Sequence, residues 1–359
     1  MKAHIQENVA LAPFTTFGIG GPARYFINAS SEETVLEAVE FAKTRNHPLF
    51  VLGGGSNLLV ADRGFPGVVL KIGLTGMEWN DDRDKATVRV AAGEDWDRLV
   101  QLSVERDLGG IECLSGIPGS VGGTPVQNVG AYGQEISEVL TGVRAYDRTT
   151  GAIADLSRED CGFTYRSSIF NTAAKNRYIV LNVTYALRRH AAPSISYSDV
   201  RNEFEGNAQP PTLSEVRNAV RRIRARKAML LAEGDPDCRS AGSFFKNPII
   251  SATEFSALES LLPNERVPRY PAPPGKVKTA AAWLIERAGF SKGYSLGPAG
   301  LSTKHTLALV NKGQARAEDV LRLADQIRDR VKDRFGIQLV PEPVFVGFDV
   351  SPVLRQIKL

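Results

Sequence analysis

LSGIPGSVGGTPVQNVGAYG, residues 114–133, holds six glycines and no charged residue. Because glycine lacks a Cβ atom, such a segment can adopt positive φ and bring bare backbone against a flat or phosphorylated ligand. Apolar residues such as Ile117, Val121 and Val129 are interspersed, whereas flexible glycine linkers are polar throughout. We therefore expect an ordered loop that either binds a ligand or crosses the core irregularly between strands.

A second glycine turn, GGGSN at residues 53–57, lies between two short apolar runs. Its successive amides can hold a diphosphate, with Ser56 and Asn57 as side-chain donors. A tight β-turn between strands explains the pentapeptide equally well, but the longer glycine segment favours the phosphate site. The GxGxxA pattern at residues 18–23 is weaker, because Pro22 and the β-favouring residues after it predict a strand where a dinucleotide-binding turn requires a helix.

The composition limits the classes of function. The chain has 359 residues, a formal net charge of +4 and three cysteines without a CxxC pair. This length allows two or three domains. Basic residues scattered among nearly as many acidic ones favour small anionic ligands over nucleic acid. The cysteines indicate a reduced cytoplasmic compartment, and we expect neither a signal peptide nor a membrane span.

Apolar periodicity predicts several strands and helices. The expected strands cover residues 68–72, 87–91, 139–146, 152–156 and 177–187, and a helix covers 95–106. A helix over 317–335 is expected to bury Val320, Leu323, Ala324, Ile327 and Val331.

Two further helices carry start signals. Ser30 with Glu33, and Thr212 with Glu215, predict capping boxes. The apolar face of the first helix is expected to comprise Val35, Leu36, Val39 and Ala42. The arginines that follow Glu215 are expected to form a mostly solvated face, with one or two of the last reaching an anionic ligand.

Three polar residues are candidates for chemistry. Arg166, in YRSSIF, carries a planar fork that matches a carboxylate, although a surface arginine with a packed stem explains this motif on its own. Ser243, in AGSFFKNP, can serve as nucleophile, hydrogen-bond donor or general acid. Glu342 lies between two prolines in an apolar run, which favours desolvation and a raised pKa; the alternative is a strand-edge glutamate paired with an arginine.

A serine hydrolase fits Ser243 poorly. The GxSxG elbow is absent, because Phe244 and Phe245 follow the serine, and the chain has only four histidines. A proton-donor role stays open, and no metal site is expected.

Taken together, eight segments resemble one family, the UDP-N-acetylenolpyruvoylglucosamine reductases. In chain order they are TFGIGGPARYF, VLGGGSNLLV, GIPGSVGGTPVQNVGAYGQEI, YRSSIF, AGSFFKNP, KTAAAWLIERAGF, KHTLALVN and PEPVFVGF. A chance match to one segment is easy, whereas eight in family order are not expected by chance. SYSDV and its long flanking loop resemble the subtype that closes a tyrosine over the substrate.

The resemblance implies an α+β protein with a two-subdomain FAD-binding fold of the vanillyl-alcohol-oxidase (PCMH) type and a C-terminal α/β substrate-binding domain. The expected parts are residues 1–75 with 336–359 returning to them, 76–190, the linker and substrate loop 191–211, and the substrate domain 212–335. FAD is expected to be noncovalent, because Ser56 and Asn57 stand where some relatives attach flavin through histidine.

The implied FAD contacts lie in the two glycine segments. They are Gly53, Gly54, Gly55, Ser56, Asn57, Ser115, Gly116, Pro118, Gly119, Ser120, Gly122, Gly123, Thr124, Asn128, Gly130, Ala131 and Tyr132.

The implied reaction is reduction of UDP-N-acetylglucosamine enolpyruvate to UDP-N-acetylmuramate, a step of peptidoglycan precursor synthesis, with NADPH as cosubstrate. Arg166 and a protonated Glu342 would stabilise the enolate, and Ser243 would donate the proton. The implied substrate contacts are Tyr197, Lys227, Asn247 and His305. A cytoplasmic monomer without nucleic-acid or membrane partners is expected.

Two rival functions remain. One is a flavin oxidase of the same fold, and the other is a nonenzymatic binder of nucleotide sugars. Both predict that no NADPH consumption depends on an enolpyruvyl sugar nucleotide.

Overall fold

The computed structural model describes residues 3–349, which divide into two compact units. Unit 1 consists of residues 3–9, 23–55 and 66–226, and unit 2 consists of residues 10–22, 56–65 and 227–349. Each unit is described by itself. The domain boundaries expected from the resemblance stay predictions.

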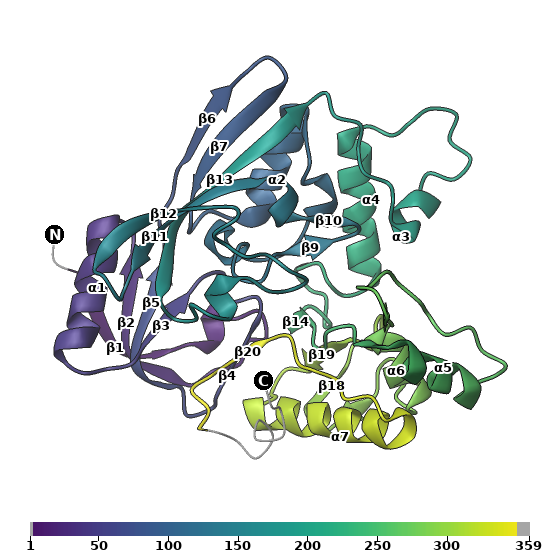
Figure 1. Cartoon of the computed structure of the whole chain (residues 1–359). Coiled ribbons are helices and arrows are strands. Elements are labelled where there is room, and N and C mark those ends of the chain that lie inside the picture. The colour runs from purple at the N-terminus through teal and green to yellow at the C-terminus, as the bar shows by residue number, and fades with distance from the viewer. Residues whose placement is uncertain (1–2, 350–359) are drawn as a thin grey trace. The chain divides into compact units, whose positions relative to one another are not determined.

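Unit 1 is built on two sheets (Figure 1). The first has the order β1–β2–β5–β3 and comprises Ile5–Ala10, Pro22–Ala29, Phe65–Ile72 and Leu49–Leu52. The second is antiparallel, has the order β12–β11–β13–β7–β6, and comprises Ala152–Ser157, Leu140–Asp147, Tyr178–Arg189, Lys85–Ala91 and Met77–Asp81. Short β8 (Leu108–Gly109) pairs with β13, and β9 (Gly130–Ala131) pairs with β10 (Gln134–Glu135).

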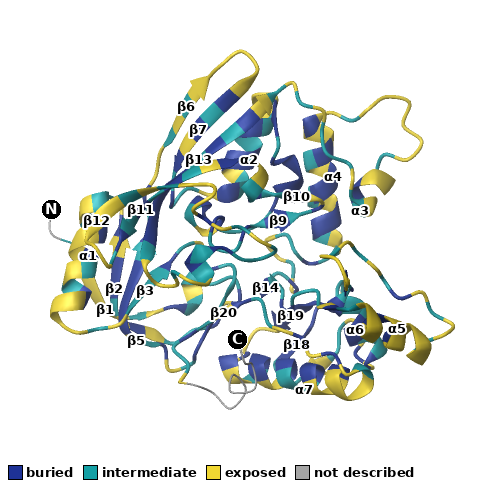
Figure 2. Cartoon of the chain, in the orientation of Figure 1, coloured by how far each residue is buried: buried dark blue, intermediate teal, exposed yellow. Residues whose placement is uncertain are grey.

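Four helices complete unit 1: α1 (Glu32–Thr44), α2 (Trp96–Glu105), α3 (Ser198–Asn202) and α4 (Leu213–Arg226). Figure 2 shows buried residues gathered along β11 and β13, whereas much of α1 is exposed. The core includes Trp96 and Tyr185, whose rings meet edge to face 5.8 Å apart. The start of α2 is thereby fixed against the central strand β13.

Unit 2 contains a four-stranded sheet of order β14–β19–β18–β17, made of Ser240–Ser243, Ala308–Asn311, Ala299–Leu301 and Ser295–Leu296. Helix α7 (Ala317–Phe335) packs against β18 and β19 (Figure 1). The antiparallel pair β15–β16 (Ile249–Ser251, Lys276–Lys278) adjoins α5 (Ala252–Leu261), and α6 (Ala281–Arg287) adjoins α7. Strand β20 (Val344–Val346) pairs in parallel with β4 (Leu58–Val60).

The expected elements are confirmed within a few residues of their bounds. The buried stripe of α7 matches the prediction, because all five apolar residues at helical spacing are buried. The Thr212–Glu215 capping box is also present: Thr212 N donates to Glu215 and Glu215 N donates to Thr212 Oγ1. Pro22 begins a strand, as predicted against the dinucleotide-turn interpretation.

Two details at α1 differ from the prediction. The N-cap is Ser31, whose hydroxyl accepts from Thr34 N, so the Ser30–Glu33 box was placed one residue early. Leu36 is exposed, because the buried stripe runs through Val35, Ala38 and Ala42 and Leu36 lies about 100° around the helix from Val35.

A third difference concerns α4. The face of α4 that was predicted to be mostly solvated has an exception at Arg224, which is 7% exposed. Arg217 is also nearly buried, because its guanidinium meets the carboxylate of Asp97 on α2. These side chains were assigned to solvent because their partners lie far away in the sequence.

Candidate active site

The two glycine segments touch each other in unit 1. A Cβ atom added to Gly54 would lie 2.5 Å from Gly119 Cα, and one added to Gly53 would lie 2.8 Å from Ser120 Oγ. Real Cβ atoms do not approach other atoms this closely, so only glycine permits the contact at Gly54. Two segments far apart in the sequence therefore form one backbone-rich surface.

Ser120 supplies a polar group at this contact. Its hydroxyl oxygen is buried and has no hydrogen-bond partner among the residues that the structure describes. A buried hydroxyl left unsatisfied costs about 1–3 kcal/mol. A ligand with phosphate or ring heteroatoms would remove this cost. The adjacent Gly119 has a positive φ of +135°, a backbone conformation that only glycine adopts readily. The cradle fits FAD.

Other residues expected to bind FAD hold the loop itself. Thr124 Oγ1 shares a hydrogen bond of 2.7 Å with the buried Tyr185 hydroxyl. The Asn128 amide donates to the Glu135 carboxylate at 2.7 Å and to Thr164 O at 3.2 Å. These two side chains therefore fix the shape of the segment. They would contribute to ligand binding through the backbone that they position.

Arg166 lies against the same loop. Its Nη2 donates to Gly130 O at 2.6 Å and its Nη1 to Asn128 O at 3.5 Å. The backbone of Arg166 is left-handed (φ 54°), a conformation that costs a non-glycine residue on the order of 1–3 kcal/mol. The mutual hydrogen bonds of Thr164 and Ser167 hold this turn. The structure thus brings the predicted anion clamp to the glycine loop.

Tyr197 also reaches the loop. It occupies the N-cap position of α3, and its ring meets the ring of Tyr132 edge to face with centroids 5.6 Å apart. Behind it, the Glu203 carboxylate accepts from Arg222 and Arg226 of α4. The tyrosine segment is therefore docked on α4 in this structure.

Unit 2 brings Ser243 and Glu342 to one place. Ser243 ends β14, pairs with Ala308 of β19 and follows the left-handed Gly242 (φ +69°). The next residue, Phe244, is fully buried, and its carbonyl accepts from Glu342 N at 2.8 Å. One backbone hydrogen bond therefore joins the segment that carries Ser243 to the segment that carries Glu342.

Asn57 joins this cluster. Its side-chain amide donates to Glu342 O at 3.4 Å, and its own carbonyl accepts from Val344 N at 2.9 Å. These bonds begin the parallel pairing of β4 with β20. Ser56 precedes it, and its carbonyl accepts from Thr16 Oγ1 at 3.3 Å. The second half of GGGSN therefore belongs to the Ser243–Glu342 cluster of unit 2.

The residues expected at the substrate diphosphate differ in their surroundings. Asn247 Oδ1 accepts from Ala281 N at 3.0 Å, at the start of α6, so its carbonyl side has a structural role. His305 is half-buried in the turn before β19, and its backbone N–H donates to Ser302 Oγ at 3.3 Å. Lys227 is half-buried and is the first residue of the third segment of unit 2.

The sequence interpretation missed Asp237, which organises the His305 turn. Asp237 is 3% exposed, and its Oδ2 accepts from Ser302 Oγ, Thr303 N and Thr303 Oγ1 at 2.6 to 2.9 Å. No local pattern reveals this, because the donors lie more than sixty residues further along the chain.

Asp97 and Arg224 were also missed. Both bond to Gly116 of the glycine loop. One signal was available for the arginine: Arg217, Arg221 and Arg224 are spaced i, i+4, i+7, which places them on one side of a helix.

Within residues 3–349, no three His, Cys, Asp or Glu side chains are grouped so that they could hold a metal ion. None of the described helices is both long and apolar enough to cross a membrane.

Comparisons with known proteins agree with this geometry. A family model described as an FAD binding domain matches residues 23–157, and one described as the C-terminal domain of UDP-N-acetylenolpyruvoylglucosamine reductase matches residues 235–346. These matches confirm the expected architecture, an FAD-binding fold of the vanillyl-alcohol-oxidase type followed by a second domain, and they confirm FAD as the cofactor.

Two relatives of high identity have the same name. The UDP-N-acetylenolpyruvoylglucosamine reductase of Thermobifida fusca (strain YX) is 47% identical over 97% of this chain and 99% of its own. That of Streptomyces coelicolor is 47% identical over 96% of this chain and 91% of its own. The crystal structure of the Thermus caldophilus enzyme (MurB) aligns with a TM-score of 0.66 at 27% identity, over 96% of this chain and 99% of that one.

Identity at this level over nearly the whole chain, together with the two matching family models, shows that the chain belongs to the UDP-N-acetylenolpyruvoylglucosamine reductase family of FAD-dependent oxidoreductases.

Proposed function

We propose that this protein reduces UDP-N-acetylglucosamine enolpyruvate to UDP-N-acetylmuramate, with NADPH as the electron donor, in peptidoglycan precursor synthesis. The observation that carries the proposal is the bond of 2.8 Å from Glu342 N to Phe244 O, which joins the segment bearing the serine to the segment bearing the carboxyl. Neither rival function, the flavin oxidase or the nonenzymatic binder of nucleotide sugars, requires a hydroxyl and a carboxyl close together.

Bound FAD supplies the hydride that adds to the terminal carbon of the enolpyruvyl double bond. The residues of the chain then handle the charge and the proton. As the hydride adds, negative charge develops on the substrate carboxylate, which becomes an enolate. In our proposal the Arg166 guanidinium and a protonated Glu342 carboxyl stabilise that charge, and preorganised donors of this kind contribute roughly 10²–10³ in rate each.

Ser243 completes the reaction in this proposal by protonating the enolate at the carbon attached to the ether oxygen. An alcohol is a weak acid, but an enolate bearing two oxygens is a strong base, so the transfer is favourable. A positioned proton donor contributes roughly 10²–10⁴ in rate. The short backbone connection to the buried Phe244 gives Ser243 the fixed position that such a transfer needs.

Tyr197, Lys227, Asn247 and His305 are proposed to hold the UDP diphosphate. This set offers a phenol hydroxyl, an ammonium, an amide and an imidazole, all of which can donate hydrogen bonds to phosphate oxygens. We place the reaction in the cytoplasm, in keeping with three cysteines that are all free thiols.

Anaerobic stopped-flow absorbance of the flavin tests the proposal, because it separates the two half-reactions. For Ser243→Ala we expect flavin reduction by NADPH at the wild-type rate, followed by a turnover at least about a hundredfold slower when the enolpyruvyl substrate is added. Wild-type turnover in this variant would eliminate Ser243 as the proton donor.

Ser260→Ala provides the matched control. Ser260 is an exposed residue of α5 in the same unit, and its hydroxyl donates to the helix carbonyl of Ser256. Both half-reactions should keep their wild-type rates. If wild-type enzyme reduced by NADPH is not reoxidised by the enolpyruvyl substrate at all, the proposed reaction itself is wrong.

A further inference from the structure

Both backbone polar groups of Gly116 in the glycine loop are bonded to charged side chains from helices. Gly116 N donates to Asp97 Oδ1 of α2 at 2.6 Å, and Gly116 O accepts from Arg224 Nε of α4 at 3.1 Å. Gly116 is left-handed (φ +70°) and buried. Its orientation therefore depends on two helices that flank the loop.

Two more arginines of α4 hold Asp97 in place. Arg217 Nη1 and Nη2 donate to Oδ1 and Oδ2 at 2.6 and 3.0 Å, and Arg221 Nη1 donates to Oδ2 at 2.6 Å. Partial burial opposes ionisation of Asp97, but the Arg217 guanidinium, the Gly116 amide and Arg221 outweigh it, so the pKa of this carboxyl lies below its ordinary value. The carboxylate is thus charged and has a single orientation.

Arg224 is the most buried member of the group. Burial lowers its pKa, whereas nearby Tyr132 and Asp97 oppose that shift, and a guanidinium stays charged in proteins in any case. A charge taken out of water is costly unless it is bonded. Arg224 donates a hydrogen bond to Gly116 O and lies near Tyr132, and both residues belong to the glycine loop. Contacts with this loop therefore offset the cost of burying the guanidinium.

The start of α2 makes two further bonds to the same segment. Trp96 Nε1 donates to Leu114 O and Trp96 N donates to Gly119 O, both at 3.1 Å. Gly119 is the residue that touches Gly54 of the other glycine turn. Displacement of the 114–120 backbone would therefore also disturb the surface that both turns form.

We propose that Asp97, Arg217, Arg221 and Arg224 form a bracket that sets the 114–120 backbone in its FAD-binding shape before the cofactor arrives. These four are positioning residues: they act through Gly116. A loop that is already ordered loses less conformational entropy on binding, which raises affinity. The inference depends on FAD as the cofactor and is independent of the proposed reaction.

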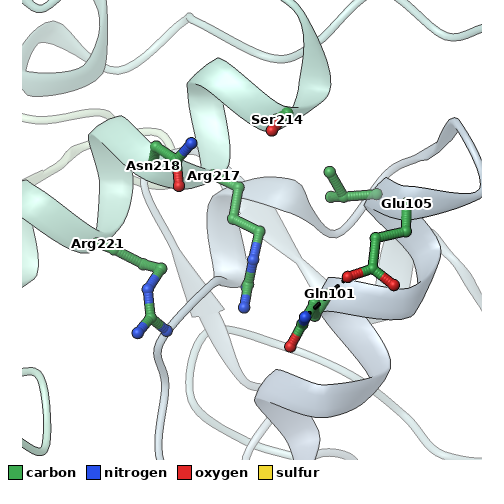
Figure 3. Close-up of a pocket in the computed structure, with 7 residues that line it drawn as sticks. Gln101, Glu105, Ser214, Arg217, Asn218 and Arg221 are labelled. Atoms are coloured by element: carbon green, nitrogen blue, oxygen red, sulfur yellow. Dashed lines mark hydrogen bonds between the residues drawn. The ribbon is translucent and has the colours of Figure 1, made fainter.

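The outer side of the bracket opens into a surface cavity of about 320 Å³ between α2 and α4 (Figure 3). Its lining comprises Gln101, Val104, Glu105, Ser214, Arg217, Asn218 and Arg221. In the figure, Arg217 extends from α4 toward α2, while Glu105 is bonded to Gln101 on its own helix at 2.7 Å. Glu105 therefore belongs to the cavity wall but not to the bracket.

The test measures FAD affinity of the full-length protein after removal and readdition of the cofactor, by flavin fluorescence. For Arg217→Gln we expect the FAD dissociation constant to rise roughly tenfold to hundredfold, because two hydrogen bonds between charged groups are lost. Thermal unfolding of the FAD-free protein should change little. At saturating FAD, turnover per bound flavin should return to the wild-type value, which a general folding defect would not allow.

Arg222→Gln is the matched control, because the same substitution on the same helix breaks the pairing with Glu203 and leaves Asp97 intact. Glu105→Gln changes the cavity wall alone. Both should bind FAD as the wild type does. The proposal is overturned if Arg217→Gln binds FAD as tightly as Arg222→Gln.

If Arg217→Gln fails to fold, Arg217→Lys takes its place. Lysine keeps the charge but cannot make the bidentate contact with Asp97, so FAD should dissociate from the purified holoenzyme severalfold faster than from the wild type. An unchanged release rate would contradict the bracket as well.

Discussion

The two units hold their candidate functional groups in opposite ways. In unit 1 the candidate binding surface is backbone, and side chains hold it: Asp97 accepts from Gly116 N and Arg224 donates to Gly116 O. In unit 2 the candidate groups are side chains, and backbone hydrogen bonds join the segments that carry them: Glu342 N bonds to Phe244 O, and Lys246 N bonds to Val340 O.

This difference predicts which substitutions each unit tolerates. Where backbone hydrogen bonds join the segments that carry the candidate side chains, an isosteric exchange of such a side chain leaves those bonds in place, so chemistry should be lost while the fold remains. A backbone held by side chains should move when those side chains, or the glycines that permit the approach, are changed. The predictions below follow this division, from the largest effect to the smallest.

Gly54→Ala should have the largest effect. The added Cβ atom would lie 2.5 Å from Gly119 Cα, and neither backbone can retreat without moving its turn. We expect purified protein without bound FAD and therefore without turnover, as measured by the flavin absorbance spectrum.

Gly142→Ala is the control for this change, because a Cβ atom there would make only an ordinary contact, 3.5 Å from Leu156 O. The control should stay yellow. A yellow Gly54→Ala protein with wild-type FAD affinity would show that the contact between the two glycine turns is not needed for binding.

Glu342→Gln should leave the structure intact and slow turnover roughly a hundredfold to a thousandfold. The backbone bonds of residue 342 to Phe244 and Asn57 do not involve the carboxyl, so unit 2 should fold and FAD should remain bound. Steady-state turnover and the flavin spectrum measure the two parts of this prediction.

Glu259→Gln, at an exposed position of α5, provides the comparison and should behave as wild type. Loss of FAD from Glu342→Gln would mean that the carboxyl also has a structural role, and the contrast between the units would fail at this residue.

Asp237→Asn tests a place in unit 2 where a side chain holds a backbone turn, the one that carries His305. An asparagine amide would meet the Ser302 and Thr303 donors with N–H groups in place of one carboxylate oxygen, so the His305 turn should loosen. We expect the free energy of unfolding to fall by about 1–3 kcal/mol. We also expect KM for the enolpyruvyl substrate to rise severalfold with kcat little changed.

Asp333→Asn, exposed on α7, should change neither quantity. If the KM of Asp237→Asn equals that of the wild type while stability falls, His305 does not contact the substrate diphosphate, although Asp237 still stabilises the turn.

The sequence predicted those parts of the site whose chemistry is local. Runs of glycine indicate close backbone approach wherever they occur, and most strands and helices followed from apolar periodicity. Ser243 and Glu342 became candidates because of their local sequence and because short segments around them resemble a family. Asp97, Arg224 and Asp237 could not be found in this way, because each is an ordinary charged residue whose role depends on which distant backbone the fold brings to it.

The smallest effects concern the cysteines, of which Cys113 and Cys161 lie in unit 1 and can report on its shape. Burial, with nearby Asp160 and Glu159, raises the pKa of Cys161 to about 12, so roughly 10⁻⁴ of this thiol is ionised at pH 8. Burial likewise raises the pKa of Cys113, whose thiol donates to Ser194 O. Half-buried Cys238 of unit 2 should therefore be alkylated first in the native holoenzyme, with no loss of turnover.

Mass spectrometry after iodoacetamide treatment measures this order, and denatured protein should label at all three positions. Because the thiolate fraction rises tenfold per pH unit below the pKa, labelling of Cys161 should accelerate about tenfold between pH 8 and 9. Cys113 directly precedes the glycine loop, so Arg217→Gln stripped of FAD should label there faster than stripped wild type if side chains hold this backbone in place. Equal labelling of Cys113 in the two proteins would mean that the loop keeps its shape without the bracket, and the contrast between the two units would then rest on the glycine contact alone.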